Sequence, residues 1–128
     1  MSTSRPSVLV VDDEQSVLHR ACEVLEARGY EVLPAPDLDR MVEVLERGSP
    51  EAVLLDLMMP EILGSDLVGY VREVHGIRGP VLLFSNIAEG QLQAYVRSSG
   101  ADGFIVKDPG LKQLAERLPS FLPLPALD

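Results

Sequence analysis

Three scarcities in the sequence exclude several classes of protein. A single cysteine, Cys22, rules out an internal disulfide, and its place in a helical apolar pattern suggests a small core residue in a reducing compartment. Only 11 basic residues stand against 20 acidic ones, and the net charge of -9 disfavours binding to nucleic acid or to an anionic membrane. No apolar run approaches the roughly 18 residues that span a bilayer, and no segment resembles a signal peptide. We therefore expect a cytoplasmic protein.

The 128 residues, 46% of them hydrophobic, suit one globular domain. Short apolar runs alternate with longer segments of helical period, which is the pattern of five β-α units around a parallel sheet. The predicted strands are residues 8–11, 31–33, 52–55, 81–84 and 104–106. All but the second are apolar throughout, as central parallel strands should be, so residues 31–33 are expected at an edge.

Glycine and proline mark the expected ends of the helices. The first four helices are predicted to stop at Gly29, 48–50, Gly76 and Gly100. The fifth is expected to begin with Asp108 as its N-cap and Pro109 in its first position, and to end at Pro119. The resulting division of the chain is a disordered N-terminus, 1–6; a globular domain, 7–119; and a tail that is either packed or the stub of a linker, 120–128.

Polar side chains follow four of the predicted strands, namely Asp12 with Asp13, then Asp56, Ser85 and Lys107. The carboxyl ends of parallel strands share one edge of the sheet, and open α/β sheets bind their ligands there. Carboxylates are the ligands that Mg²⁺ prefers, and a carboxylate can attack phosphorus if a divalent cation and a fixed positive side chain offset the charge. The pattern predicts a magnesium ion and a phosphoryl group at this edge, with Asp56 as the acceptor and the Ser85 hydroxyl as a donor.

Each of these residues also has a simpler explanation when it is taken alone. Asp12 and Asp13 fit the start of a helix, because acidic residues there are favoured by the helix dipole. Asp56 could form a turn, Ser85 could cap one, and Lys107 could be a solvated charge at a strand end. Their coincidence at strand ends that converge in one fold favours a common site.

The same residues resemble those of the response-regulator receiver domains of bacterial two-component signalling, and the likeness covers essentially the whole chain. The strongest motif is Asp-x-x-Met-Pro-x-x-x-Gly, which spans 56–64 here. The acidic pair of the family falls on Asp12 and Asp13, followed by Glu14. Its hydroxyl residue falls on Ser85, its lysine on Lys107 and its aromatic switch position on Phe104.

The resemblance implies a flavodoxin-like (βα)5 fold, a doubly wound parallel sheet of strand order 2-1-3-4-5 in three α/β/α layers. It implies that Asp13, Asp56 and the backbone carbonyl of Met58 bind Mg²⁺, with Asp12 acting mainly through a bound water. Asp56 would take phosphate from a histidine kinase or a phosphotransfer protein. Such a domain is a phosphoacceptor with weak self-catalysis rather than a conventional enzyme.

The resemblance also implies how the signal leaves the domain. Ser85 would move toward the phosphoryl group and Phe104 would rotate inward, which remodels the surface of the fourth and fifth helices. The target would be another protein or an effector domain, and a phosphorylation-dependent homodimer through those helices stays open.

Three features depart from the family pattern. Lys107 is followed by Asp108 where proline is usual, so a cis or a trans peptide stays open there. Asn86 stands where a small residue is usual, and the fifth helix is short before Pro119. A pseudo-receiver that binds partners without phosphorylation therefore remains an alternative, whereas an aspartyl phosphatase is disfavoured because the acidic pair is adjacent and the chain has no room for a cap domain.

Overall fold

A computed structural model describes residues 5–125 as a five-stranded, wholly parallel sheet flanked by helices. The strands are β1 (Ser7–Val11), β2 (Glu31–Ala35), β3 (Ala52–Asp56), β4 (Val81–Ser85) and β5 (Gly103–Val106). The helices are α1 (Gln15–Arg28), α2 (Leu38–Arg47), α3 (Gly64–His75), α4 (Glu89–Ser99) and α5 (Lys112–Phe121). The strand order is β2-β1-β3-β4-β5, so the predicted flavodoxin-like topology is confirmed.

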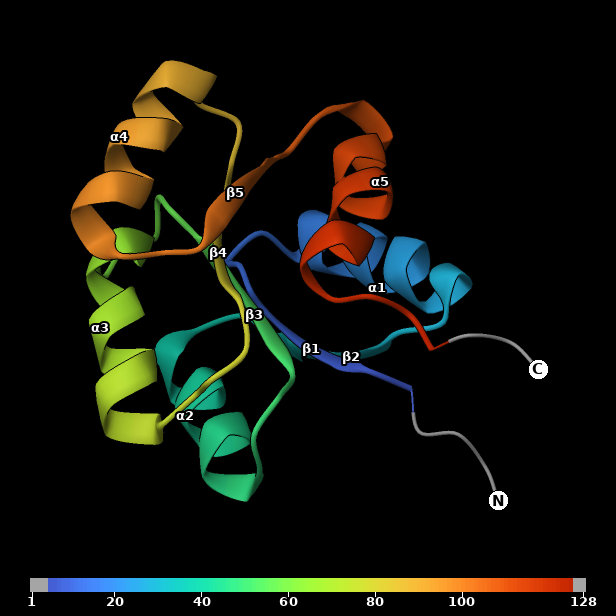
Figure 1. Cartoon of the computed structure of the whole chain (residues 1–128), viewed down its shortest axis with the longest axis horizontal. Coiled ribbons are helices and arrows are strands. Elements are labelled where there is room, and N and C mark those ends of the chain that lie inside the picture. Colours follow the sequence, from blue (N-terminus) through green and yellow to red (C-terminus); the bar gives the residue numbers. More distant parts are fainter. Residues whose placement is uncertain (1–4, 126–128) are drawn as a thin grey trace.

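Helices cover both faces of the sheet and give three layers (Figure 1), with α1 and α5 on one face and α2, α3 and α4 on the other. Successive residues of each central strand enter different cores, because strand side chains alternate between faces. Leu55 of β3 packs in the core beneath α2, α3 and α4, whereas Leu54 packs in the core beneath α1 and α5. This two-sided burial is the reason that the central strands are apolar throughout.

The first four helices end where they were predicted to stop, with α2 ending at Arg47 directly before Gly48. Gly29, Gly76 and Gly100 follow α1, α3 and α4, and all three have positive φ. The amide of Gly29 donates to the carbonyl of Glu26, which closes the last turn of α1. No helix within residues 5–125 has the length and apolar character required to cross a membrane.

The second strand is longer than predicted and contains Pro34. Alternate residues of a strand direct their amides to opposite sides. The Glu31 amide donates to the Pro6 carbonyl on the side of β1, so the nitrogen of Pro34, three residues later, faces away from β1. The edge position of β2 therefore lets a proline extend the strand without losing a hydrogen bond of the sheet.

The prediction that the fifth helix ends at Pro119 was wrong, and Asp108 and Pro109, as N-cap and first residue, begin a 3-10 turn and not α5 itself. A short 3-10 turn, Pro109–Leu111, precedes α5, which continues through Pro119 to Phe121. Pro119 has no amide to donate to the carbonyl four residues back, but only two residues of α5 follow it, and the Leu122 amide still donates to the Leu118 carbonyl at 2.8 Å.

The chain beyond Pro119 packs onto the domain as far as it is described. Phe121, Leu122 and Leu124 contact the core beneath α1 and α5, and the Tyr30 hydroxyl donates to the Leu122 carbonyl at 2.6 Å. At the other end Pro6 is buried. The rest of the predicted disordered N-terminus and of the tail, 1–4 and 126–128, lies outside the described residues.

Candidate functional site

The carboxyl edge of the sheet brings together the three aspartates that the sequence singled out. Val11 of β1 pairs with Leu55 of β3, so the residues that follow them, Asp12 and Asp56, lie side by side. Asp12 is fully buried and Asp56 is 3% exposed, whereas Asp13 faces solvent. One carboxylate oxygen from each aspartate lies within 4.8 Å of the others. Two buried carboxylates and one accessible carboxylate thus form a compact acidic cluster.

Lys107, at the end of β5, reaches back across β4 to this cluster. Its Nζ lies 2.6 Å from Asp12 Oδ2 and 3.1 Å from Asp56 Oδ1, and its side chain is only 11% exposed. The ammonium also lies 5.2 Å from the centre of the Phe84 ring. Lys107 is therefore a largely buried, paired charge and not a solvated one at a strand end.

Burial and crowding change the ionisation of the acceptor candidate. Burial, reinforced by the Asp12 carboxylate and only partly offset by Lys107, raises the pKa of Asp56 to about 6. For Lys107, burial acts to lower the pKa, but hydrogen bonding and attraction from Asp12 and Asp56 together hold it above its ordinary value. The ammonium stays charged at neutral pH, while Asp56 ionises close to the physiological range.

The loop after Asp56 is held by the motif that begins with it. Asp56 Oδ1 accepts a hydrogen bond from the Met58 amide at 3.2 Å, and Met58 forms an isolated antiparallel bridge with Leu63. The Gly64 amide then donates to the Leu57 carbonyl at 2.8 Å. A Cβ at Gly64 would lie 2.2 Å from the carbonyl oxygen of Asp56, so the start of α3 touches the backbone of the candidate acceptor. The sequence showed this glycine in the motif but not the contact that requires it.

Ser85 lies on β4, the strand next to that of Asp56, and Phe104 lies on β5, one strand farther away. Ser85 is buried, and its Oγ accepts a hydrogen bond from the Ile87 amide at 3.3 Å; no hydrogen bond joins it to Asp56 within the described part of the chain. Asn86, which follows, is exposed. Phe104 packs in the core beneath α2, α3 and α4, with the Arg117 guanidinium of α5 5.0 Å from its ring centre. The amphipathic pattern of α5 gave no sign of this contact, and sequence reasoning missed Arg117.

The peptide between Lys107 and Asp108 is trans, as are all peptide bonds between residues 5 and 125. Asp108 Oδ1 accepts a hydrogen bond from the Gln113 amide at 3.0 Å, in the first turn of α5. Asp108 therefore caps α5 as predicted, although a short turn separates Asp108 from the first residue of the helix.

The acidic cluster fits a hard divalent cation. Its donors are carboxylate oxygens, and three carboxylates against one ammonium leave an excess of negative charge. Asp12 Oδ2 is buried and, apart from its ion pair with Lys107, accepts no well-directed hydrogen bond from residues 5–125. The chemistry of this donor set matches Mg²⁺ better than it matches a softer metal.

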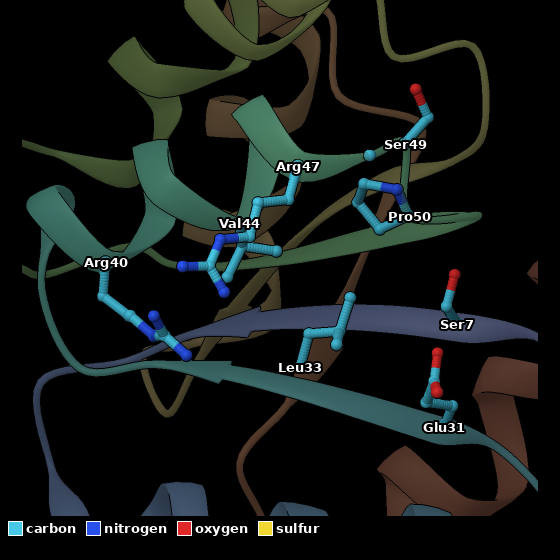
Figure 2. A pocket seen from close by; sticks show the side chains of 9 residues that line it. Ser7, Glu31, Leu33, Arg40, Val44, Arg47, Ser49 and Pro50 are labelled. Carbon is cyan, nitrogen blue, oxygen red and sulfur yellow. The ribbon is translucent and has the colours of Figure 1, made fainter.

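A cavity of about 300 Å³ lies elsewhere, between α2 and the edge strand β2. Figure 2 shows Arg40 and Arg47 of α2 above Leu33, with Glu31 and Ser7 farther along the strands. Arg40 is engaged with Glu43 at 2.7 Å. The cavity includes none of the aspartates, so it is separate from the acidic cluster.

Comparison with known proteins agrees with this geometry. The model of the response regulator receiver domain family matches residues 8–119, and this chain belongs to that family. PhoB, the phosphate regulon transcriptional regulatory protein of Escherichia coli, is 32% identical over 114 residues, which cover 87% of this chain and 49% of PhoB. KdpE of Mycobacterium tuberculosis is 30% identical over 111 residues, or 87% of this chain and 48% of KdpE. The chain spans about half the length of the curated relatives it matches.

Two solved structures share the fold over nearly their whole length. The chemotaxis protein CheY4 of Vibrio cholerae has a TM-score of 0.83 and 25% identity, covering 93% of this chain and 100% of CheY4. TrrA of Thermotoga maritima, solved in complex with Mg(2+)-BeF, has a TM-score of 0.76 and 26% identity, covering 91% of this chain and 98% of TrrA. The predicted family is confirmed, and the chain is the receiver domain type found in two-component response regulators.

Proposed function

We propose that this domain accepts a phosphoryl group on Asp56 from the phosphohistidine of a sensor kinase or of a phosphotransfer protein, in a reaction that requires Mg²⁺. The observation that carries the proposal is the meeting of buried Asp56 with two further carboxylates and the Lys107 ammonium at one edge of the sheet. The complex of TrrA with Mg(2+)-BeF supports it by analogy.

The transfer needs one carboxylate oxygen of Asp56 to be free. Asp56 Oδ1 already accepts hydrogen bonds from the Met58 amide and from Lys107 Nζ, so we assign the attack on phosphorus to Oδ2. The new O–P bond forms while the P–N bond of the donor breaks, and its electron pair stays on the imidazole nitrogen. Lys107 then lies beside a phosphoryl oxygen and offsets part of its charge.

The aspartates have separate proposed roles toward Mg²⁺. Asp13 and Asp56 would hold the ion directly together with the Met58 carbonyl, and Asp12 would act mainly through a bound water. When bound, the ion supplies positive charge that offsets the repulsion between Asp56 and the incoming anion. The same residues would admit water to the acyl phosphate later, so the domain would dephosphorylate itself slowly without being a conventional enzyme.

The proposed switch runs through Ser85 and Phe104. A phosphoryl group adds about -1.5 to -2 charge and three acceptor oxygens at Asp56, and the Ser85 hydroxyl would leave the Ile87 amide to donate to one of them. Movement of Ser85 would change the packing of Phe104 on the neighbouring strand. Because Arg117 lies over the Phe104 ring, a shift of the ring would also move α5.

We infer that the output is read by a protein target or an effector domain, with a phosphorylation-dependent homodimer as one form of it. The net charge of -9 makes nucleic acid an unsuitable partner for the domain itself, and we place it in the cytoplasm. The domain boundaries 7–119 remain a prediction.

Intact-protein mass spectrometry tests the proposed function. Incubation with a small phosphodonor and Mg²⁺ is expected to add one phosphoryl group to the wild-type chain, and none to Asp56→Asn or after chelation of the metal. Absence of an adduct in folded wild-type protein, with small donors and with its own kinase, would contradict the proposal and favour a phosphorylation-independent pseudo-receiver.

A further inference from the structure

Asp108, the residue after Lys107, is held in place by three hydrogen bonds. The Asp108 amide donates to the Val106 carbonyl at 3.0 Å, and the Asp108 carbonyl accepts from the Leu111 amide at 2.9 Å. The Asp108 carboxylate accepts from the Gln113 amide at 3.0 Å. Three hydrogen bonds on one residue join the end of β5 to the first turn of α5.

The segment between Asp108 and α5 is a defined turn and not a loose loop. Pro109 and Gly110 occupy the central positions of a type II turn, in which Gly110 has φ 74 and ψ 5. Leu111 follows with φ 52, the only non-glycine residue of the described chain with positive φ, and its side chain is buried. A left-handed leucine is unfavourable by itself, so the surrounding contacts must hold this geometry in place.

Lys107 is fixed from both sides by this arrangement. Its amide donates to the Ser85 carbonyl at 2.8 Å, which continues the pairing of β5 with β4. On its other side the hydrogen bonds of Asp108 set the direction in which the chain leaves. Between these two anchors the ammonium reaches Asp12 and Asp56.

We propose that Asp108 is a positioning residue for Lys107: its carboxylate fastens the N-terminus of α5 to the end of β5 and thereby holds the ammonium between Asp12 and Asp56. This inference rests on the proposed function of the site. Asp108 does not touch the acceptor within the contacts of residues 5–125 and acts through the backbone of its neighbour. The side chain accepts its hydrogen bond from an amide of α5, so the carboxylate is directed toward the N-terminus of that helix.

The chain offers a matched control for this inference. Asp37 caps α2 in the same chemical way, accepting from the Arg40 amide at 2.8 Å, but it lies outside the acidic cluster. Replacing either aspartate by alanine removes one cap, and only the Asp108 change should disturb Lys107. Asp108→Asn keeps an acceptor oxygen at the same place without the charge, whereas Asp108→Glu keeps the charge but moves the oxygen.

The experiment compares Asp108→Ala, Asp108→Asn, Asp108→Glu and Asp37→Ala for phosphoryl uptake at saturating small donor and Mg²⁺. We expect uptake to slow about tenfold in Asp108→Ala and to slow in Asp108→Glu, because misplaced catalytic groups lose rate steeply. Asp108→Asn and Asp37→Ala should stay within about twofold of wild type. Equal rates in Asp108→Ala and Asp37→Ala would overturn the inference. If Asp108→Ala does not fold, Asp108→Glu takes its place in this comparison.

A second readout separates this inference from the proposed function. The nitrogen resonance of the Lys107 ammonium should shift in Asp108→Ala and stay unchanged in Asp37→Ala, since only the first changes the surroundings of Nζ. If wild type takes up no phosphoryl group, the proposed function fails while the resonance still tests the positioning. A resonance that does not move in Asp108→Ala would overturn the positioning role, whatever the activity.

Discussion

At the scale of single residues, the acidic cluster is a place where the fold is under electrostatic stress. Asp12 and Asp56 are both buried, and one ammonium, Lys107, is shared between them. Burying charges costs free energy that pairing repays only in part. Burial of the Asp56 carboxylate raises its pKa, and repulsion from Asp12 adds to the shift, because the protonated form avoids both costs. The acidic cluster is therefore expected to be more stable with a bound cation than without one.

A prediction about pH follows from the raised pKa. In the folded state the pKa of Asp56 is about 6, against 3.8 for an isolated side chain, so the folded state holds the extra proton. Between about pH 4 and 6 the unfolded chain binds fewer protons, so stability without metal should fall as pH rises through this range. In urea unfolding with chelator present, the free energy of unfolding of Asp56→Asn should rise relative to that of wild type across that range, by at most about 3 kcal/mol. A difference that stays constant with pH would contradict the assigned pKa.

At the scale of elements, the junction between β3 and α3 determines how the loop of the site is held. Gly64 begins α3 directly against the Asp56 carbonyl, and the Met58 amide donates to the Asp56 carboxylate. The end of a strand and the start of a helix therefore share one tight contact. Any side chain at residue 64 would move the acceptor or the helix.

Gly64→Ala should test that contact. Its Cβ would lie 2.2 Å from the Asp56 carbonyl oxygen, so we expect a loss of about 2 kcal/mol or more in unfolding free energy and slower phosphoryl uptake. Gly69→Ala, in the same helix with no atom within 4 Å of the added carbon, should gain up to about 1 kcal/mol from helix propensity. Urea denaturation measures both, and a neutral Gly64→Ala would refute the contact.

At the scale of the whole molecule, different parts of the chain complete the cores on the two faces of the sheet. The core beneath α2, α3 and α4 is built from elements within the predicted domain. The core beneath α1 and α5 also takes in Phe121, Leu122 and Leu124, beyond Pro119. The Phe121 ring lies where a side chain at Gly103 would otherwise stand, with its Cζ 2.7 Å from the position of a Cβ. Phe121, Leu122 and Leu124 therefore pack as part of the folded domain, and truncation at the predicted boundary tests whether the domain ends there.

Truncation after Pro119 should therefore destabilise the domain. Loss of the three half-buried side chains is expected to cost about 3 kcal/mol in unfolding free energy. Tyr30→Phe removes only the hydrogen bond to the Leu122 carbonyl and should cost about 1 kcal/mol. Thermal unfolding of both variants makes the measurement, and a truncated chain as stable as wild type would mean that residues 120–128 are a linker after all.

The sequence by itself determined the features that depend on neighbouring residues. Apolar runs and glycine stops placed the strands and most helix ends, since periodicity and capping are local. The order of polar residues after the strands named Asp12, Asp56, Ser85 and Lys107 as one site, because parallel strands end at a common edge. The family resemblance added the strand order and the separate roles of these residues.

Only the tertiary structure decided what depends on residues far apart in the chain. The helical path through Pro119 follows from packing of Phe121 on β5, which overrides the local effect of proline. Likewise the closeness of Gly64 to Asp56, the burial of Lys107 and the position of Arg117 over Phe104 exist only once strands and helices pack. Such contacts join surfaces of different elements, and neither a period nor a cap in the sequence records them.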